Sequence, residues 1–220
     1  NAERVAGLNA FHQRLASLRF LDPACGCGNF LIVTYRELRL LELDVIGELY
    51  KKDQLLDVST IVRCNVNQLH GIEIEDFHTQ IARVAMWLID HQMNMLVSQH
   101  YGTHFARIPL KTSADIQNAN ALTNEWPEVD YILGNPPFIG ARLMNKDQKE
   151  DVNNIFDGWK SIGNLDYVSC WYKKSADFMY NTFIKTALVS TNSITQGEAV
   201  PTLWKPLFDS GIQFDFAYRT

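Results

Sequence analysis

The stretch Asp130-Tyr-Ile-Leu-Gly-Asn-Pro-Pro-Phe138 constrains this sequence more than any other, because a short apolar run ends abruptly in a turn that contains two prolines. The β-branched and aromatic residues before Gly134 predict a buried strand, and the Gly, Asn and Pro residues predict where it ends. Each proline fixes its own φ at about −65° and restricts the residue before it. The turn after the strand is therefore rigid.

This rigid turn places two hydrogen-bond acceptors close together. The side-chain carbonyl of Asn135 and the backbone carbonyl of Pro136 are able to accept both hydrogens of a planar amino group, with Pro137 stiffening the turn and Phe138 offering a ring for stacking. The same tetrapeptide also fits a purely structural turn followed by a core phenylalanine. Taken alone, it does not decide between the two interpretations.

A second motif follows a predicted strand at 19–21 and reads Asp22-Pro-Ala-Cys-Gly-Cys-Gly-Asn-Phe30. Gly26 and Gly28 have no Cβ, so the backbone between the strand and the next helix is able to approach a ligand closely. The loop lacks the third glycine of the dinucleotide fingerprint and the lysine of a P-loop. It is typical of a nucleotide-binding loop, and an ordinary tight strand-to-helix turn is the alternative.

Acidic residues follow two further predicted strands. Strand 68–74 carries Glu73 at its end, where a carboxylate is placed to accept hydrogen bonds from both hydroxyls of a ribose; a solvated acid is the alternative. A short strand near 108–113 leads to Asp115 and Ile116, which predict an acceptor for an adenine amino group and an apolar cover for the ring. Asp115 also fits a helix N-cap.

Helical spacing of apolar residues predicts helices at 1–18, 29–52, 77–97 and 165–184, and further strands are predicted at 187–192 and 213–218. The predicted core face of helix 77–97 consists of Ile81, Val84, Ala85, Leu88, Ile89 and Met95. Strands that alternate with helices predict an α/β fold with a mostly parallel sheet, helices on both faces and a ligand crevice at the carboxyl ends of the strands. Asp22, Glu73, Asp115 and Asn135 then fall at four successive strand ends.

Composition excludes several classes of protein. A chain of 220 residues with 46% hydrophobic residues fits one α/β domain, and a net charge of −5 argues against a domain that grips a polyanion over its whole surface. The four cysteines lack the paired spacing of a zinc site, so we expect no metal and reduced, intracellular thiols. We find no membrane-spanning run and no signal peptide. Because the first residue is Asn1, we expect the chain to be part of a longer one.

Together, the motifs at 22–30, 71–74, Asp115 and 135–138 resemble the DNA amino-methyltransferases that use S-adenosyl-L-methionine, and their order resembles the γ group of those enzymes. The segments 165–167 and 190–197 are similar to the MmeI-like restriction-modification enzymes in particular. Two features depart from the family pattern. Cys27 stands where the family usually has Ser, and the N-terminal cofactor motif of the γ group is missing.

The resemblance implies a Rossmann-like, class I methyltransferase fold over 1–220, with a leading helix at 1–18, a cofactor-binding half at 19–116 and a target-base half at 117–220. It implies catalysis by the Asn135-to-Phe138 turn. The cofactor contacts that it implies are Asp22, Ala24, Cys25, Gly26, Gly28, Asn29, Phe30, Glu73, Ile74, Asp115 and Ile116.

The expected reaction is methylation of the adenine N6 amino group in double-stranded DNA, in the bacterial cytoplasm. The resemblance implies a nuclease domain upstream and a target-recognition domain downstream, through which most DNA contacts would be made, so we expect residues 1–220 to be inactive by themselves. An Asn-Pro-Pro turn recognises an amino group and not a polymer, so a methyltransferase of RNA bases or of protein glutamine is the alternative. A catalytically silent adenosylmethionine-binding domain is a second alternative.

Overall fold

The computed structural model of the chain describes residues 2–50, 61–101, 113–197 and 199–218. The strands and longer helices are α1 (Ala2–Ser17), β1 (Phe20–Asp22), α2 (Asn29–Leu49), β2 (Leu69–Glu73), α3 (Asp76–Tyr101), β3 (Asp115–Asn118), β4 (Tyr131–Gly134), α4 (Lys146–Ile155), α5 (Ser169–Met179), β5 (Lys185–Leu188) and α6 (Lys205–Asp209). The single-turn helices are η3 (Val66–Gln68), η4 (Ile162–Asn164), η5 (Asn192–Thr195) and the π-helical η6 (Val200–Trp204).

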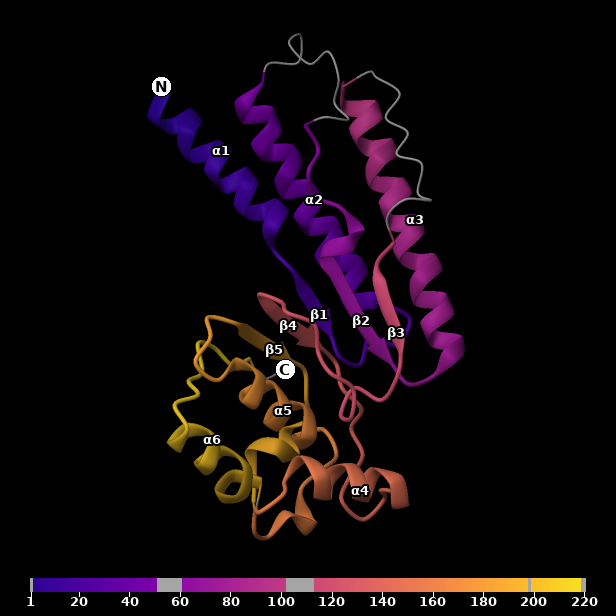
Figure 1. The fold of residues 1–220 in the computed structure, drawn as a ribbon, viewed down its shortest axis with the longest axis vertical. Helices are drawn as coiled ribbons and strands as arrows, with labels where there is room; N and C mark the ends of the chain where they lie inside the picture. The colour runs from indigo at the N-terminus through magenta and orange to yellow at the C-terminus, as the bar shows by residue number, and fades with distance from the viewer. Residues whose placement is uncertain (1, 51–60, 102–112, 198, 219–220) are drawn as a thin grey trace.

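The five strands form one sheet in the order β3-β2-β1-β4-β5, and every neighbouring pair is parallel. α1, α2 and α3 gather around β1, β2 and β3 in one part of the molecule, and α4, α5 and α6 gather beside β4 and β5 in the other (Figure 1). Strand order reverses between β1 and β4, which is where ligands bind in open sheets of this kind. The predicted Rossmann-like α/β fold is confirmed.

Successive side chains of a strand point to opposite faces of the sheet, so the hydrophobic core is divided between the two faces. Leu21, Ile72 and Ile132 point into a cluster that includes Trp171 of α5. Leu69 and other residues of the opposite face join a second cluster with the buried side chains of α2 and α3. Since both faces are covered, only the ends and edges of the sheet are left for a ligand.

Polar side chains also join α2 to α3. The hydroxyl of Tyr35 donates to Asp90 Oδ1 at 2.6 Å, and the fully buried guanidinium of Arg39 donates to the Tyr35 hydroxyl at 2.6 Å and to Asn94 Oδ1 at 3.1 Å. Burying a charge without such partners would be costly. This network fixes the two helices that begin beside the glycine loop and beside Glu73.

Three predicted strands differ from the structure. The β3 ladder starts at Asp115, whereas 108–112 lie outside the described residues. The fifth strand spans Lys185–Leu188 and ends earlier than predicted, and the described residues of 213–218 form no strand. In that segment Phe214 packs on Trp204 with ring centroids 4.9 Å apart, and Asp215 pairs with Lys185 at 2.7 Å. Side-chain contacts, not a ladder, therefore hold 213–218.

The positions of the predicted helices agree with the structure better than the prediction of which helix face is buried. α1 and α3 confirm the helices at 1–18 and 77–97, and α2 ends at Leu49; 51–52 of the helix predicted there lie outside the described residues. α5 is shorter than the predicted 165–184, because the chain turns at Asn181, which has φ of 56°.

The core face predicted for α3 is wrong. Of its six residues only Ile89 is buried, and Val84, Leu88 and Met95 are exposed. The buried face of α3 consists of Thr79, Ala82, Met86, Ile89, Asp90, Met93, Asn94 and Val97. The helix has apolar residues on two opposite sides, and periodicity alone does not say which side meets the sheet.

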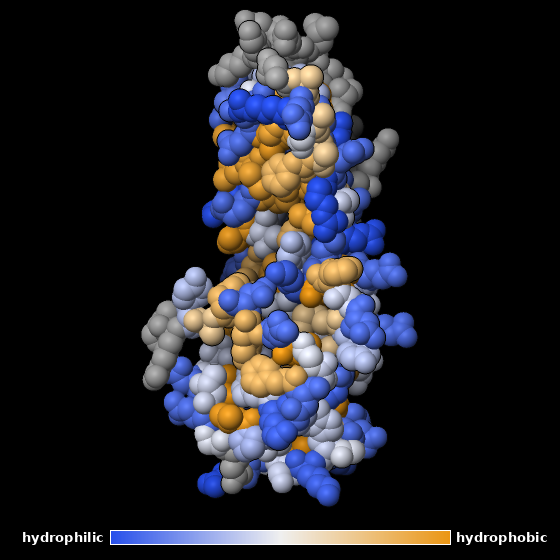
Figure 2. Space-filling view, turned by 90° about the vertical axis from the view of Figure 1, so that its left-hand side faces the viewer, coloured by the Kyte–Doolittle hydropathy of each residue, from blue (hydrophilic) through white to orange (hydrophobic). Residues whose placement is uncertain are grey.

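Apolar side chains also reach the surface on other elements. Seen from the side of α1, apolar surface appears in the upper and in the lower half of the molecule, with polar side chains between (Figure 2). Val5 and Phe11 of α1 and Phe183 before β5 are among the exposed apolar residues. None of the helices that the structure describes is long and apolar enough to cross a membrane.

Candidate functional site: the carboxyl ends of the strands

The candidate site lies where four parallel strands end. Asp22 closes β1, Glu73 closes β2, Asn118 closes β3 and Gly134 closes β4. The ladder pairs Asp22 with Gly71 and Glu73 with Asn118, so these ends lie at one edge of the sheet. The glycine loop and the Asn-Pro-Pro turn both start from this edge.

The glycine loop has a backbone that side chains would strain. Gly26 has φ of 53° and Gly28 has φ of 87°, both in the left-handed region, where glycine is favoured. A Cβ on Gly28 would also lie 3.4 Å from the Cβ of Ala82 in α3. The two glycines are therefore needed for the backbone of the turn into α2, and Gly28 packs directly on α3.

Hydrogen bonds tie this loop to its neighbours. The N–H of Cys25 donates to Ile72 O at 3.1 Å, and the N–H of Gly28 donates to Cys25 O at 2.8 Å. Trp171 of α5 donates its indole N–H to Pro23 O at 3.0 Å. The loop is thus fixed both to β2 and to a helix on the other face of the sheet.

Glu73 is the residue that organises the loop. Its Oε2 accepts the N–H of Gly26 at 2.9 Å, and its Oε1 accepts the N–H of Glu75 at 2.9 Å. Each carboxylate oxygen can accept more than one hydrogen bond, so both keep capacity for hydroxyl donors. Exposed apolar side chains of Ile74 and Phe77 follow at once. A fixed carboxylate beside apolar surface fits a nucleoside, with hydroxyls on the acid and the ring on the apolar side chains.

Asp22 lies between the glycine loop and the Asn-Pro-Pro turn. Its Oδ1 accepts the N–H of Ala24 at 3.0 Å, and a Cβ on Gly134 would lie only 2.6 Å from the same oxygen. Burial is the main reason that the pKa of Asp22 is raised to about 7; the hydrogen bond from Ala24 opposes this rise, and repulsion from Glu73 adds a smaller increase. A glycine is needed at 134 because β4 lies beside β1, where a side chain at this position would meet the Asp22 carboxyl.

The remaining predicted contacts of the loop differ in exposure. Asn29 and Phe30 open α2 and are exposed, whereas Cys25 is buried in the core beneath the loop. Burial raises the pKa of the Cys25 thiol, with Asp22 the next cause. Cys25 therefore acts in packing as a neutral thiol, and its backbone is the part that faces the loop.

The Asn-Pro-Pro turn presents its functional groups to solvent. Asn135 is exposed, and its side chain has no hydrogen-bond partner among the residues that the structure describes. Pro136 is buried, Pro137 is exposed, and the ring of Phe138 is partly exposed. The predicted core phenylalanine of the structural alternative is therefore not found. The turn holds an amide and an aromatic ring at the carboxyl ends of the strands, where the ligand crevice is predicted, and neither group is buried in the core.

Sequence reasoning missed one residue that supports this turn. Asp166 precedes α5, and its Oδ1 accepts the N–H of Ala141 at 3.3 Å, while its Oδ2 accepts the hydroxyl of Ser193 at 2.7 Å. The neighbouring N–H of Tyr167 donates to Ile139 O at 2.9 Å. The only sequence signal was the resemblance of segment 165–167, which named no role. Asp166 joins the end of the turn to the loop after β5.

The predicted positions of Asp115 and Ile116 are wrong. Asp115 starts β3 and pairs with His70, three residues before the strand end, and Ile116 is buried in the core against Gly71. Asn118 is the residue at the end, where its amide donates to the backbone oxygens of Glu73 and Ile74 at 3.0 and 2.9 Å. The structure therefore does not bring Asp115 and Ile116 to the crevice.

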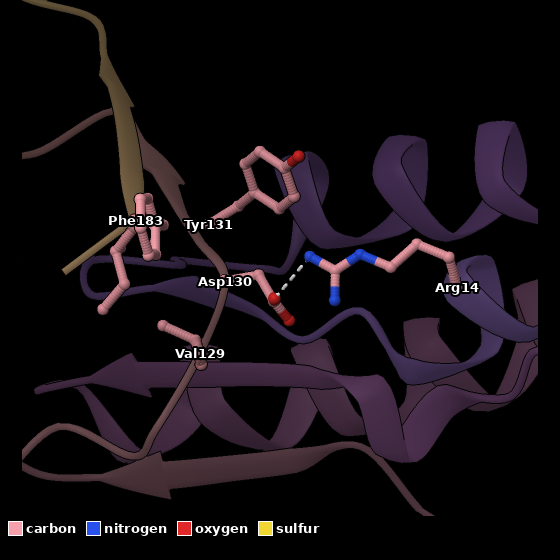
Figure 3. A pocket seen from close by; sticks show the side chains of 6 residues that line it. Arg14, Val129, Asp130, Tyr131 and Phe183 are labelled. Atoms are coloured by element: carbon pink, nitrogen blue, oxygen red, sulfur yellow. Dashed lines mark hydrogen bonds and ion pairs between the residues drawn. The ribbon is translucent and has the colours of Figure 1, made fainter. Parts of the chain in front are cut away.

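A shallow pocket lies at the opposite end of the sheet. It is lined by Arg14, Val129, Asp130, Tyr131, Phe183 and Ile184. Figure 3 shows Arg14 reaching from α1 to Asp130, and their nearest atoms are 2.8 Å apart. Asp130 precedes β4 whereas Asn135 follows it, so this pocket is separate from the crevice. The Asp130 carboxylate also accepts the N–H of Arg19 at 2.9 Å, and it ties α1 to the start of the sheet.

Comparison with known proteins agrees with this geometry. The family described as "MmeI, DNA-methyltransferase domain" matches residues 1–220. DNA methyltransferase A of Bacillus subtilis (strain 168) is 42% identical in an alignment of 216 residues that covers 94% of this chain and 24% of that protein.

Solved structures give the same result. The type IIL restriction-modification enzyme MmeI, determined in complex with DNA, is 50% identical with a TM-score of 0.90, over 94% of this chain and 29% of that one. The type ISP enzyme LlaBIII, bound to DNA, shares the fold at 18% identity with a TM-score of 0.57, over 87% of this chain and 14% of that one. The chain thus spans about a quarter of the length of DNA methyltransferase A and of MmeI.

Proposed function

Because the chain belongs to the family of MmeI DNA-methyltransferase domains, we propose that it transfers a methyl group from S-adenosyl-L-methionine to the N6 amino group of adenine in double-stranded DNA. The observation that carries the choice of an amino group is the exposed Asn135, whose side chain is unpaired among the described residues at the end of β4. The Gly134 that precedes it packs on Asp22, which begins the glycine loop. The amide thus lies next to the loop that we assign to the cofactor.

On the cofactor side, Glu73 would hold the ribose hydroxyls and the backbone of 24–28 would line the rest of the molecule. The residues fit this group, because the Glu73 carboxylate is already fixed by Gly26 and Glu75 and apolar Ile74 and Phe77 lie beside it. When bound, the cofactor supplies an electrophilic methyl group. The protein then needs only to hold the target nitrogen in line with it.

On the target side, an adenine amino nitrogen is a poor nucleophile because its lone pair is delocalised into the ring. Asn135 Oδ1 and the backbone carbonyl of Pro136 would accept its two hydrogens, hold them out of the ring plane and stabilise the positive charge that develops on nitrogen. No strong base is needed before transfer, since the methylated nitrogen loses its proton readily. Asn135 and Pro136 thus act through fixed dipoles.

The target base has to leave the duplex before it reaches this turn, at a cost of a few kcal/mol. Phe138 has its ring partly exposed beside Asn135, and stacking of a base on an aromatic ring contributes roughly 1–3 kcal/mol. Stacking would offset part of the cost of flipping. Aromatic stacking next to two acceptors suits a flat ring that carries an amino group better than it suits a glutamine side chain.

We further propose that most DNA contacts, the reading of the target sequence and any nuclease activity lie outside residues 1–220. The net charge of −5 leaves little basic surface for phosphates, and the relatives in this family are three to four times longer. The solved structures of MmeI and LlaBIII are those of restriction-modification enzymes bound to DNA. The 220 residues would therefore bind cofactor and base but would not select a site.

The direct experiment is to incubate the complete polypeptide with tritiated S-adenosyl-L-methionine and, separately, with unmodified DNA, RNA and total protein, followed by nucleoside or amino-acid analysis. Label in N6-methyladenine from DNA is the expected result. Label only in RNA or in glutamine would show that the turn serves another polymer. Cofactor binding with no transfer to any substrate would favour a silent domain.

A further inference from the structure

The outer face of α3 carries an apolar stripe that nothing in the described chain covers. We use the name α3 stripe for Phe77, Ile81, Val84, Leu88, His91 and Met95. Phe77, Val84, Leu88 and Met95 are 73%, 57%, 46% and 45% exposed, and Trp87 at the margin is 46% exposed. The opposite side of the same helix is buried on the sheet and on α2. α3 is therefore apolar on both sides, which is the pattern of a helix buried all round.

Charge is missing from this face as well. In the 26 residues of α3, Asp76, Arg83 and Asp90 are the charged side chains, apart from histidines. Asp90 is buried in the network with Tyr35, and Arg83 donates to Ile116 O at 2.7 Å. A solvated helix looks different: exposed residues of α4 include Lys146, Asp147, Lys149 and Glu150. Depletion of charge around exposed apolar groups is typical of the centre of an interface.

The spacing along the stripe indicates the shape of what covers it. Successive members are four, three, four, three and four residues apart, which is the seam of a helix that packs lengthwise against another helix. At a rise of 1.5 Å per residue, the stripe from Phe77 to Met95 is about 27 Å long. Trp87 stacks on His91 with ring centroids 6.0 Å apart and gives the seam a flat aromatic margin. The partner is thus a helix of about five turns with its own apolar stripe.

We propose that this partner is an amphipathic helix of the same polypeptide, outside residues 1–220, which packs along the α3 stripe. The similar chains of the family are longer by a factor of three to four, so they contain ample sequence for such a helix. The apolar, nearly uncharged stripe offers no lysine or arginine for DNA phosphates. Only Phe77 lies close to Glu73, so most of the stripe runs away from the crevice. The proposal does not depend on the choice of methyl acceptor.

Thiol accessibility in the complete polypeptide tests whether the stripe is covered. In the variant Leu88→Cys, maleimide labelling mapped by peptide mass spectrometry should be at least tenfold slower than in Asn153→Cys, the control at an exposed position of α4. The two should react equally after denaturation. Val84→Cys provides a second position if Leu88→Cys does not fold. Equal rates in the native protein would overturn the proposal.

Photo-cross-linking identifies the partner. A photoreactive amino acid in place of Leu88 should cross-link within one polypeptide to a predicted amphipathic helix outside residues 1–220, as judged from mixed isotope-labelled and unlabelled protein. Cross-links between two copies would show that a second copy covers the stripe. Cross-links to another part of residues 1–220, or none in a protein that shields Leu88→Cys, would also contradict the assigned partner.

Discussion

The glycine-loop side and the Asn-Pro-Pro side of the crevice differ in how their polar groups are used. On the loop side, both oxygens of Glu73 accept backbone N–H groups, and Cys25 and Pro23 are bonded to β2 and α5. On the turn side, the backbone is fixed at Gly134 and again at Ile139. Between these points Asn135 and Phe138 present their side chains to solvent.

This difference suits two ligands that arrive differently. A small cofactor that bound in the glycine loop would meet a shape that is already set, so little ordering would be left to occur on binding. A base that leaves a duplex needs acceptors that are free before it arrives. An exposed amide is hydrated until then, whereas a buried unpaired amide would cost about 1–3 kcal/mol. On the loop side, the polar groups are hydrogen-bonded within the protein. On the turn side, the backbone is rigid and the side chains are exposed to solvent.

The largest expected effect is the loss of turnover when Asn135 is replaced. Asn135→Ala removes one of the two acceptors that hold the amino group, and loss of such a group typically costs on the order of 10²–10³ in turnover. Cofactor affinity should hardly change, because Asn135 shares no hydrogen bond with Glu73 or the glycine loop among the described residues. Turnover by tritium transfer and affinity by calorimetry, both in the complete polypeptide, measure the two separately.

Asn153→Ala is the matched control for this variant, since Asn153 is an exposed asparagine on α4 away from the strand ends. It should behave as the parent protein. If Asn135→Ala lost cofactor affinity and turnover by the same factor, the two sides of the crevice would not be separate, and the catalytic role would have to be withdrawn.

The next largest expected effect is the loss of cofactor affinity when Glu73 is replaced. Glu73→Ala removes the proposed ribose acceptor and the acceptor for Gly26 N–H, so affinity for S-adenosyl-L-methionine should fall by about 1–3 kcal/mol. Glu75→Ala, in the exposed neighbour, should leave affinity unchanged. Calorimetry of both variants, with circular dichroism as a check of fold, gives the comparison. Unchanged affinity in Glu73→Ala would place the ribose elsewhere.

A smaller effect is expected at Asp166, which holds Ala141 and Ser193 and touches no proposed ligand. Asp166→Ala should reduce turnover about tenfold by loosening the turn, as misplacement of a positioned group does. The Michaelis constant for cofactor should stay the same. Asp166→Asn retains an acceptor and should recover part of the rate. Asp177→Ala, on the exposed side of α5, is the control; an equal loss there would point to α5 stability and not to the turn.

Local patterns were strong enough to predict much of this arrangement. A short apolar run before Asn-Pro-Pro, a Gly-x-Gly turn before a helix and an acid after a buried strand each depend on neighbouring residues, and β1, β2 and β4 lie where those motifs indicate. Their meeting at one edge follows from the parallel alternation of strands and helices. The cofactor and target-base roles of these residues stay predictions.

The parts that were missed depend on contacts between distant segments. Asp115 was assigned to a strand end, but the ladder with β2 runs on to Asn118, and register is set by pairing. Asp166 acts through Ala141 and Ser193, which lie 25 and 27 residues away. The face of α3 was misassigned because both sides are apolar, and only packing of Ala82 and Met86 on the sheet side decides.

The smallest expected effect is on stability, at Asp22, where the two sides of the crevice meet. Burial raises the pKa of this carboxyl from 3.8 to about 7 in the folded state, so between these values the folded protein binds more protons than the unfolded one. Stability should therefore fall as pH rises from about 4 to about 7 and change little above.

The variant Asp22→Asn removes this dependence on pH, while its amide oxygen can still accept the N–H of Ala24. The variant should melt above the parent protein at pH 8, by about 2–4 °C for each kcal/mol of penalty that it removes, and the difference should shrink toward pH 4. Asp157→Asn, at an exposed acid beyond α4, is the control. A constant difference at all pH values would mean that Asp22 stays ionised in the folded protein and that the loop and the turn meet around a charge.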